Sequence, residues 1–125
     1  MEFILIDDSA FDLFTQEKLL LKSGLAHAVK AFSSAQSAMD FLENQTEHFP
    51  ETIILLDIQM PGLNGFEFTR QYAHLPENLR RRIRIYMISS TVDTDDIARV
   101  RSNPYVMHLL SKPLEIPVLR ALLGQ

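Results

Sequence analysis

The chain of 125 residues contains no cysteine, which excludes disulfide bonds and thiol chemistry. No apolar run approaches the roughly 20 residues of a membrane-spanning helix. The first residues, MEFILIDDSAF, lack the basic region of a signal peptide. The net charge of -4 is too small to indicate a nucleic-acid or membrane partner. We therefore expect a cytoplasmic protein whose partners include neither nucleic acid nor a membrane.

The composition that remains is that of an ordinary globular protein. Hydrophobic residues make up 46% of the chain and charged residues 22%, as in typical soluble domains. A chain of this length suits one domain with one hydrophobic core. There are no repeats, linkers or low-complexity segments, so the sequence predicts a single domain over residues 1–125.

The most informative stretch is TIILLDIQMPGLNGFEF, residues 52–68. Its opening apolar run predicts a strand buried on both faces, of the kind found in parallel sheets, and Asp57 follows directly. A turn rich in proline and glycine comes next. Asn64 and Glu67 then have the spacing of a helix N-cap and its partner. Asp57 is therefore expected where a central strand ends and the chain turns towards a helix.

Similar segments recur along the chain. The first helix is expected to be capped by Ser9 and to stop at Gly24, and the second to be capped by Ser33 with Gln36 as its partner. The segment from Pro76 to Arg82 is polar and breaks the pattern. The expected strands are residues 3–6, 27–32, 53–56, 83–88 and 105–110, and the expected helices are residues 10–23, 34–44, 65–74, 94–102 and 115–123.

Five strands that alternate with five helices indicate a doubly wound parallel sheet in a three-layer α/β/α arrangement. Right-handed crossovers leave few topologies, of which the flavodoxin-like order 2-1-3-4-5 is common at this size. In that order the first and third strands are neighbours. Asp7 and Asp8, which follow the first strand, would then lie beside Asp57.

Three carboxylates at one sheet edge need a partner. Two unit charges about 5 Å apart repel by roughly 3 kcal/mol at an effective dielectric constant near 20. Such repulsion raises the pKa of each group unless a cation is bound. Oxygen ligands favour a hard ion such as Mg²⁺, which is commonly held by one or two carboxylates, water and a phosphate. We therefore expect a Mg²⁺ site for phosphoryl chemistry.

Two further strand ends carry groups that suit this chemistry. Ser89 ends the fourth strand with a hydroxyl group, and Lys112 follows the fifth with an ammonium group. Phosphoryl transfer depends mainly on positioning and charge neutralisation, and aspartate is a known nucleophile towards phosphorus. The predicted site therefore combines a nucleophile, a cation site, a hydroxyl group and a basic side chain.

At this point the sequence resembles the receiver domain of two-component response regulators, over nearly all of residues 3–123. The resemblance implies a switch that phosphorylates itself and slowly loses the phosphoryl group, not an enzyme that turns over a substrate. It also implies a sensor histidine kinase or histidine phosphotransfer protein as a partner. The matching residues are Asp7-Asp8, Asp57, Met60-Pro61-Gly62, Asn64-Gly65, Ser89-Ser90 and Lys112-Pro113.

The resemblance implies a role for each site residue. Asp57 would accept a phosphoryl group from a phosphohistidine. Asp8 would be the main Mg²⁺ carboxylate, and Asp7 would hold the ion largely through water. Asp57 and the backbone carbonyl group of Gln59 would complete the set of protein ligands.

Two further roles concern the phosphorylated form. Ser89 would bond the new phosphoryl oxygen and move with it. Lys112 would pair with Asp57 and then with the phosphate, and its bond to Pro113 is expected to be cis, a form that is largely restricted to bonds before proline. Leu109 is a departure, because many receivers have Tyr or Phe there as a ring that swings inward on activation.

Two alternatives remain open from the sequence. One is a receiver-fold binding module that works without phosphate, to which Leu109 gives slight support. The other is an aspartate-nucleophile phosphohydrolase, although the run Asp7-Asp8-Ser9 lacks the Asp-x-Asp spacing of such enzymes. The basic run at residues 80–84 is expected to be a solvated loop. We expect a free-standing receiver rather than a fragment of a longer regulator, and its output would be a protein contact or competition for phosphate.

Overall fold

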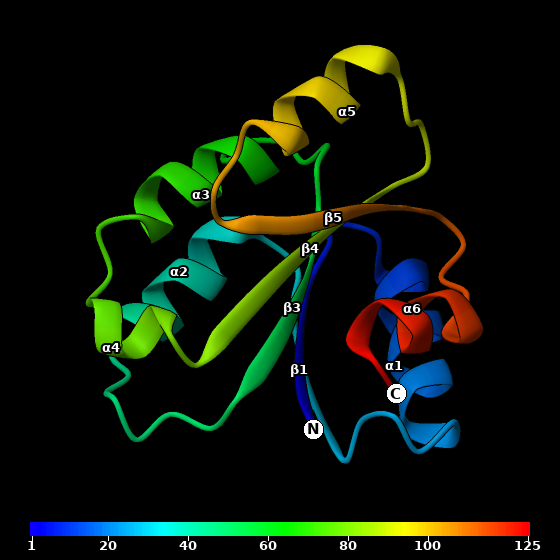
Figure 1. The fold of residues 1–125 in the computed structure, drawn as a ribbon, viewed down its shortest axis with the longest axis horizontal. Helices are drawn as coiled ribbons and strands as arrows, with labels where there is room; N and C mark the ends of the chain where they lie inside the picture. The colour runs from blue at the N-terminus through cyan, green and yellow to red at the C-terminus, as the bar shows by residue number, and fades with distance from the viewer.

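The computed structural model describes residues 1–125 as a five-stranded parallel sheet with helices on both faces (Figure 1). The strands are β1 (Glu2–Ile6), β2 (Ala28–Phe32), β3 (Thr52–Asp57), β4 (Ile83–Ser89) and β5 (Val106–Ser111). The helices are α1 (Ala10–Lys22), α2 (Ala35–Glu43), α3 (Gly65–Tyr72), α4 (Glu77–Arg80), α5 (Thr94–Arg101) and α6 (Ile116–Leu123).

The strand order is β2-β1-β3-β4-β5, which confirms the predicted flavodoxin-like topology. Glu2 of β1 pairs with Thr52 of β3, and Thr52 pairs in turn with Ile83 of β4. The central strands therefore start and end nearly level with one another. Because all strands are parallel, the residues that follow them meet at one edge.

The two faces of the sheet bury separate apolar clusters, and the strands supply both by alternation. Phe3 and Leu5 of β1 belong to the cluster that also contains Leu20 of α1 and Leu119 of α6. Ile4 belongs with Ile6 to the other cluster, beneath α2, α3, α4 and α5. Figure 1 shows α1 and α6 on one side of the sheet and the remaining helices on the other. Complete burial of each such side chain contributes roughly 1.5–3 kcal/mol.

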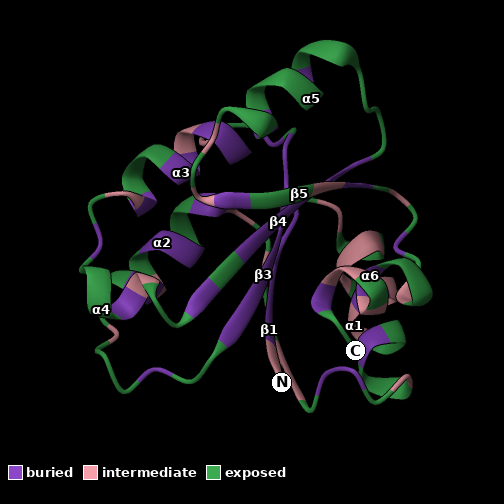
Figure 2. Ribbon diagram, viewed as in Figure 1, coloured by how far each residue is buried: buried purple, intermediate pink, exposed green.

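Burial also separates the central strands from the edge of the sheet. Every residue of β3 is buried, as the continuous apolar run predicted. β5 lies at the edge of the sheet, and only Val106 and Leu110 of its residues are buried. Figure 2 shows this contrast as continuous burial in β3 and interrupted burial in β5.

Two boundaries differ from the prediction. The cap of α2 is Ser34 and not Ser33: Ser34 has extended backbone angles and its side chain accepts a hydrogen bond from the backbone N–H of Ser37. The segment expected to be irregular contains the one-turn helix α4, which begins after Pro76. Leu79 is 1% exposed and anchors this turn to the core, so tertiary packing stabilises a helix that the polar sequence does not indicate.

α1 presents polar and apolar side chains to both the core and the solvent. Gln16 and Leu20 are buried against the sheet, while Phe11 and Phe14 are 69% and 64% exposed. The two phenylalanines, three residues apart in the chain, therefore lie on the outer surface of the helix. At 13 residues α1 is the longest helix, and none of the helices has the length and apolar character required to cross a bilayer.

Candidate functional site

The predicted site residues lie at the carboxyl-terminal edge of the sheet. Asp7 and Asp8 follow β1, and Asp57 is the last residue of β3. Ser89 ends β4 and pairs with Ser111, the residue before Lys112. In a sheet of this topology, ligands bind beyond this edge at the point where the strand order reverses. That point lies between β1 and β3, where the three aspartates are located.

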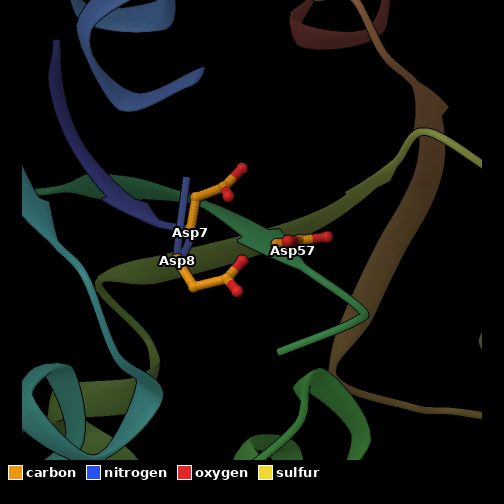
Figure 3. Close-up of side chains that lie close together, drawn as sticks. All are labelled: Asp7, Asp8 and Asp57. Atoms are coloured by element: carbon orange, nitrogen blue, oxygen red, sulfur yellow. The ribbon is translucent and has the colours of Figure 1, made fainter. Parts of the chain in front are cut away.

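The three aspartates form one cluster, in which an oxygen from each lies within 4.8 Å of the others. Figure 3 shows Asp7 and Asp8 extending from the end of β1 towards Asp57 at the end of β3. Asp7 is 1% exposed and Asp57 is 5% exposed, whereas Asp8 is open to solvent. The cluster therefore has two shielded carboxylates and one at its mouth.

Lys112 lies among these acidic groups. Its Nζ is 2.7 Å from Oδ2 of Asp7, 2.9 Å from Oδ2 of Asp12 and 3.6 Å from Oδ2 of Asp57. Burial disfavours the charged ammonium group, but the close contacts with Asp7 and Asp12 outweigh it and raise the pKa of Lys112 above its usual range. The peptide bond between Lys112 and Pro113 is cis, as predicted. The lysine thus balances part of the negative charge of the cluster.

The negative charge of Asp57 is only partly balanced by this lysine. Burial, followed by repulsion from Asp7, raises its pKa from 3.8 to about 6. Attraction to Lys112 and a hydrogen bond from the Gln59 backbone N–H to Oδ1, at 3.3 Å, act in the opposite direction. At neutral pH the group is still largely ionised. Without a further cation, its charge is therefore held at a cost in stability.

The loop after β3 is packed tightly against the end of its own strand. A Cβ atom on Gly65 would lie 2.9 Å from the backbone oxygen of Asp57, closer than packed atoms allow. Glycine permits this approach, and the N–H of Gly65 donates to the carbonyl of Ile58 at 3.0 Å. Asn64 and Glu67 form the predicted reciprocal cap of α3. The loop that carries Gln59 is therefore held in place at both ends.

Ser89 lies at the predicted edge but contacts its own loop. It is 1% exposed, and its hydroxyl group donates to the carbonyl of Thr91 at 2.8 Å and accepts from the Thr91 N–H at 3.2 Å. Leu109, the departure noted in the sequence, is half-buried in β5 and pairs with Met87. The structure thus brings Asp7, Asp8, Asp57 and Lys112 into one cluster, with Ser89 beside it in a separately bonded loop.

Sequence reasoning did not place Asp12, an acidic residue in the first turn of α1, at the site. Its contact with Lys112 joins residues 100 positions apart in the chain. A pattern within one helix carries no signal for such a contact. The distance between the strand ends would have been needed to find it.

The donor set suits a magnesium ion. Oδ2 of Asp7 is buried and accepts no well-directed hydrogen bond, although the ammonium group of Lys112 is near it. The three carboxylates supply hard oxygen ligands with no nitrogen or sulfur ligand among them. A divalent cation beside Asp8 and Asp57 would reduce the repulsion that raises the pKa of Asp57.

Comparisons with known proteins bear on the family and the fold of the chain. A family model described as the response regulator receiver domain matches residues 3–124. The chain is similar to the crystal structure of a response regulator receiver protein from Dyadobacter fermentans, with 60% identity, a TM-score of 0.95 and coverage of 99% of this chain and 95% of the other. A two-component response regulator from Cytophaga hutchinsonii is 25% identical, with a TM-score of 0.88 and coverage of 98% and 93%.

Two curated proteins are similar over shorter stretches. The two-component response regulator ARR14 of Arabidopsis thaliana is 32% identical over 79 residues, which are 63% of this chain and 20% of the relative. Protein PilH of Pseudomonas aeruginosa is 35% identical over 68 residues, which are 54% of this chain and 51% of the relative. The matches thus span about a fifth of one relative and about half of the other.

Proposed function

Because the chain belongs to the response regulator receiver family, we propose that it is a phosphorylation-controlled switch. Asp57 accepts a phosphoryl group from a phosphohistidine on a sensor histidine kinase or a histidine phosphotransfer protein. The reaction depends on Mg²⁺, and the modified protein changes its contacts with a downstream protein. Residues 1–125 act as one receiver domain, located in the cytoplasm, that also slowly removes its own phosphoryl group.

The observation that carries this proposal is the cluster of three aspartates at the switch point of the sheet, two of which, Asp7 and Asp57, lie against Lys112. The position of Asp57 suits a nucleophile. A carboxylate oxygen of Asp57 forms the new bond to phosphorus as the bond from phosphorus to the donor histidine breaks. The imidazole nitrogen keeps the electron pair of that bond and takes a proton from solvent. Family members are generally phosphoacceptor switches of this kind and not enzymes with turnover on a separate substrate.

Four groups would hold the ion: the carboxylates of Asp8 and Asp57, Asp7 largely through water, and the backbone carbonyl group of Gln59. When bound, Mg²⁺ neutralises the charge of the incoming phosphoryl oxygens. Asp8 is exposed and accessible to a hydrated ion. Asp7 is held by the backbone N–H of Ser9, which donates to its Oδ1 at 2.9 Å, so the buried carboxylate keeps a fixed orientation.

Two side chains respond to the new phosphoryl group. Lys112 turns from its acidic neighbours to a phosphoryl oxygen, a short movement because Oδ2 of Asp57 is 3.6 Å from Nζ. The hydroxyl group of Ser89 leaves Thr91, which it now contacts in both directions, and donates to another phosphoryl oxygen. Rearrangement of this loop changes the surface near α5 and β5, so that phosphorylation biases a two-state element.

Incubation with Mg²⁺ and acetyl phosphate tests the proposal. We expect one acid-labile phosphoryl group on the wild-type protein, detected by mass spectrometry of the intact chain. Asp57→Asn should abolish uptake, and chelation of Mg²⁺ should do the same. Asp40→Asn is a matched control, because Asp40 is exposed on α2 and bonds only to Gln36 at 2.9 Å. Absence of uptake by the wild type, or equal uptake by Asp57→Asn, would contradict the proposal.

A second candidate is a receiver-fold module that binds its partner without phosphate. One observation favours it: position 109 holds leucine where many receivers have the aromatic ring that moves on activation. Full presence of the acidic cluster and Lys112 argues against it. A partner whose affinity is the same for the wild type, for Asp57→Asn and after removal of Mg²⁺ would favour this candidate.

A further inference from the structure

Asp12 is a third acidic residue, besides Asp7 and Asp57, that contacts the lysine of the site. Its Oδ2 accepts a hydrogen bond from Nζ of Lys112 at 2.9 Å, shorter than the 3.6 Å between Nζ and Asp57. Asp12 is on α1, outside the three-aspartate cluster. Its side chain is 35% exposed, whereas that of Lys112 is 13% exposed. The ammonium group of Lys112 therefore lies between a buried carboxylate, with which it forms an ion pair, and a partly exposed one, to which it donates a hydrogen bond.

The bonding at the start of α1 leaves Asp12 free for this contact. Ser9 caps the helix, and its side chain accepts from the Asp12 N–H at 3.2 Å. An acidic side chain at this third position often returns to the N–H of the cap residue. Here that N–H already donates to Oδ1 of Asp7, at 2.9 Å. The carboxylate of Asp12 thus has no capping role to fill, and it reaches Lys112 instead.

We propose that Asp12 is a positioning residue that holds Lys112 in the unphosphorylated protein and releases it when Asp57 is modified. The inference rests on the proposed function, because it concerns the lysine that a phosphoryl group on Asp57 would engage. Movement of Nζ towards a phosphoryl oxygen on Asp57, which is now 3.6 Å away, lengthens or breaks its 2.9 Å hydrogen bond to Asp12. The contact with Asp12 therefore stabilises the unmodified state relative to the modified one, and it opposes phosphorylation.

The size of the effect follows from the exposure of Asp12. Ion pairs with one partner near the surface have modest interaction energies, typically a fraction of 1 kcal/mol to about 1 kcal/mol, or about a two- to fivefold change in an equilibrium constant. A first-turn aspartate that served only the helix dipole would also stabilise α1. That role, however, is independent of Lys112 and of the state of Asp57. The two roles can therefore be separated by experiment.

Calorimetric titration of beryllofluoride in the presence of Mg²⁺ measures how readily the site takes up a phosphoryl-like group. We expect Asp12→Asn to bind beryllofluoride about two- to fivefold more tightly than the wild type. Asp12→Glu keeps the charge and should restore an affinity close to that of the wild type. Asp95→Asn is the matched control: Asp95 is an exposed first-turn aspartate of α5 and makes no ion pair.

A second measurement separates contact with Lys112 from general charge repulsion. In urea unfolding without ligand, Asp12→Asn should lower the unfolding midpoint in the wild-type background but have a clearly smaller effect in Lys112→Met. Unchanged or weaker beryllofluoride binding by Asp12→Asn overturns the inference. Tighter binding with equal effects of Asp12→Asn in both backgrounds also overturns it, because repulsion alone would then explain the gain. A wild type that binds no beryllofluoride overturns the proposed function, and this inference with it.

Discussion

Charged side chains gather at both ends of the sheet, but they are arranged in opposite ways. At the carboxyl-terminal edge, acidic groups lie buried around one lysine. At the amino-terminal edge, where β3 and β4 begin, Arg81, Arg82 and Arg84 are exposed. These arginines line a pocket of about 450 Å³ together with Glu51. Every ion pair in the structure, apart from a surface contact of Glu47 with His48, involves Lys112.

This difference shows where charged side chains lower the stability of the fold. Exposed guanidinium groups at the amino-terminal edge remain hydrated and need no partner. Asp7 and Asp57 are nearly inaccessible to water, so their repulsion is not screened and the pKa of Asp57 rises to about 6. Such an arrangement lowers the stability of the folded protein unless a bound ligand offsets the repulsion. The contrast therefore favours the proposal that the carboxyl-terminal edge is the functional end.

Among the substitutions that test this contrast, loss of Lys112 should change the free energy of unfolding most. Lys112→Met keeps much of the aliphatic stem but leaves Asp7 and Asp57 without their buried cation. We expect the free energy of unfolding at pH 7 to fall by about 3 kcal/mol, as when one partner of a buried pair is removed. The loss should shrink as the pH falls through 6, because Asp57 then becomes protonated. Urea unfolding at several pH values measures both effects, and a loss that did not vary with pH would contradict the account.

Binding of Mg²⁺ should restore much of the stability that the acidic cluster loses through repulsion. At one hundred times its dissociation constant, a ligand that binds only the folded state stabilises it by about 2.7 kcal/mol. We expect the thermal midpoint of the wild type to rise with Mg²⁺ and that of Asp8→Asn to rise much less. Arg82→Gln, at the opposite end, should respond as the wild type does. Equal responses of Asp8→Asn and the wild type would place the ion elsewhere.

Removal of the Asp57 charge should stabilise the protein without Mg²⁺. The folded-state pKa of about 6 lies above the ordinary value of 3.8. Between these pH values the folded protein holds a proton that the unfolded chain has lost. Stability therefore falls as the pH rises from about 4 to about 6, and the deficit persists above that range. The shift corresponds to at most about 3 kcal/mol.

Asn at position 57 also loses the attraction to Lys112, so we expect Asp57→Asn to gain about 1–2 kcal/mol at pH 7. The gain should disappear near pH 4, where the wild-type carboxyl group is protonated in the folded protein. Unfolding curves of the two proteins at pH 4 and pH 7 check this. Equal stability of the two proteins at pH 7 would show that Asp57 carries no such cost.

The smallest effect should come from the amino-terminal edge. Arg82→Gln and Arg84→Gln each remove an exposed charge with no ion pair. We expect the free energy of unfolding to change by less than about 0.5 kcal/mol, at pH 4 as at pH 7. The same unfolding experiments measure this. A loss near that of Lys112→Met would erase the contrast between the two ends.

The sequence predicted the sheet well because β1 and β3, at its centre, contain continuous apolar runs. Residues 53–56 indicated a fully buried strand, and β3 is buried throughout. The parallel topology then followed from alternation, which put Asp57 beside Asp7 and Asp8. These predictions rest on local pattern and on rules of connection, both of which are readable from one chain.

Features that depend on tertiary contact could not be read in the same way. The turn α4 forms because Leu79 is buried, and the polar residues around it give no hint of this. Lys112 was expected at the site, but its nearest partners are Asp7 and Asp12. Contacts between residues about 100 positions apart depend on how closely strand ends and helix starts converge. Hydrophobic periodicity does not encode that distance.

The central claim is that Asp7, Asp8 and Asp57 bind a divalent cation and that Asp57, beside the ion, accepts the phosphoryl group. A crystal structure with Mg²⁺ and beryllofluoride tests it most directly. We expect one ion about 2.0–2.1 Å from carboxylate oxygens of Asp8 and Asp57, beryllofluoride bonded to Asp57, and Nζ of Lys112 turned towards its fluorine atoms. An ion bound away from these carboxylates, or beryllofluoride absent from Asp57 at saturating concentration, would contradict the claim.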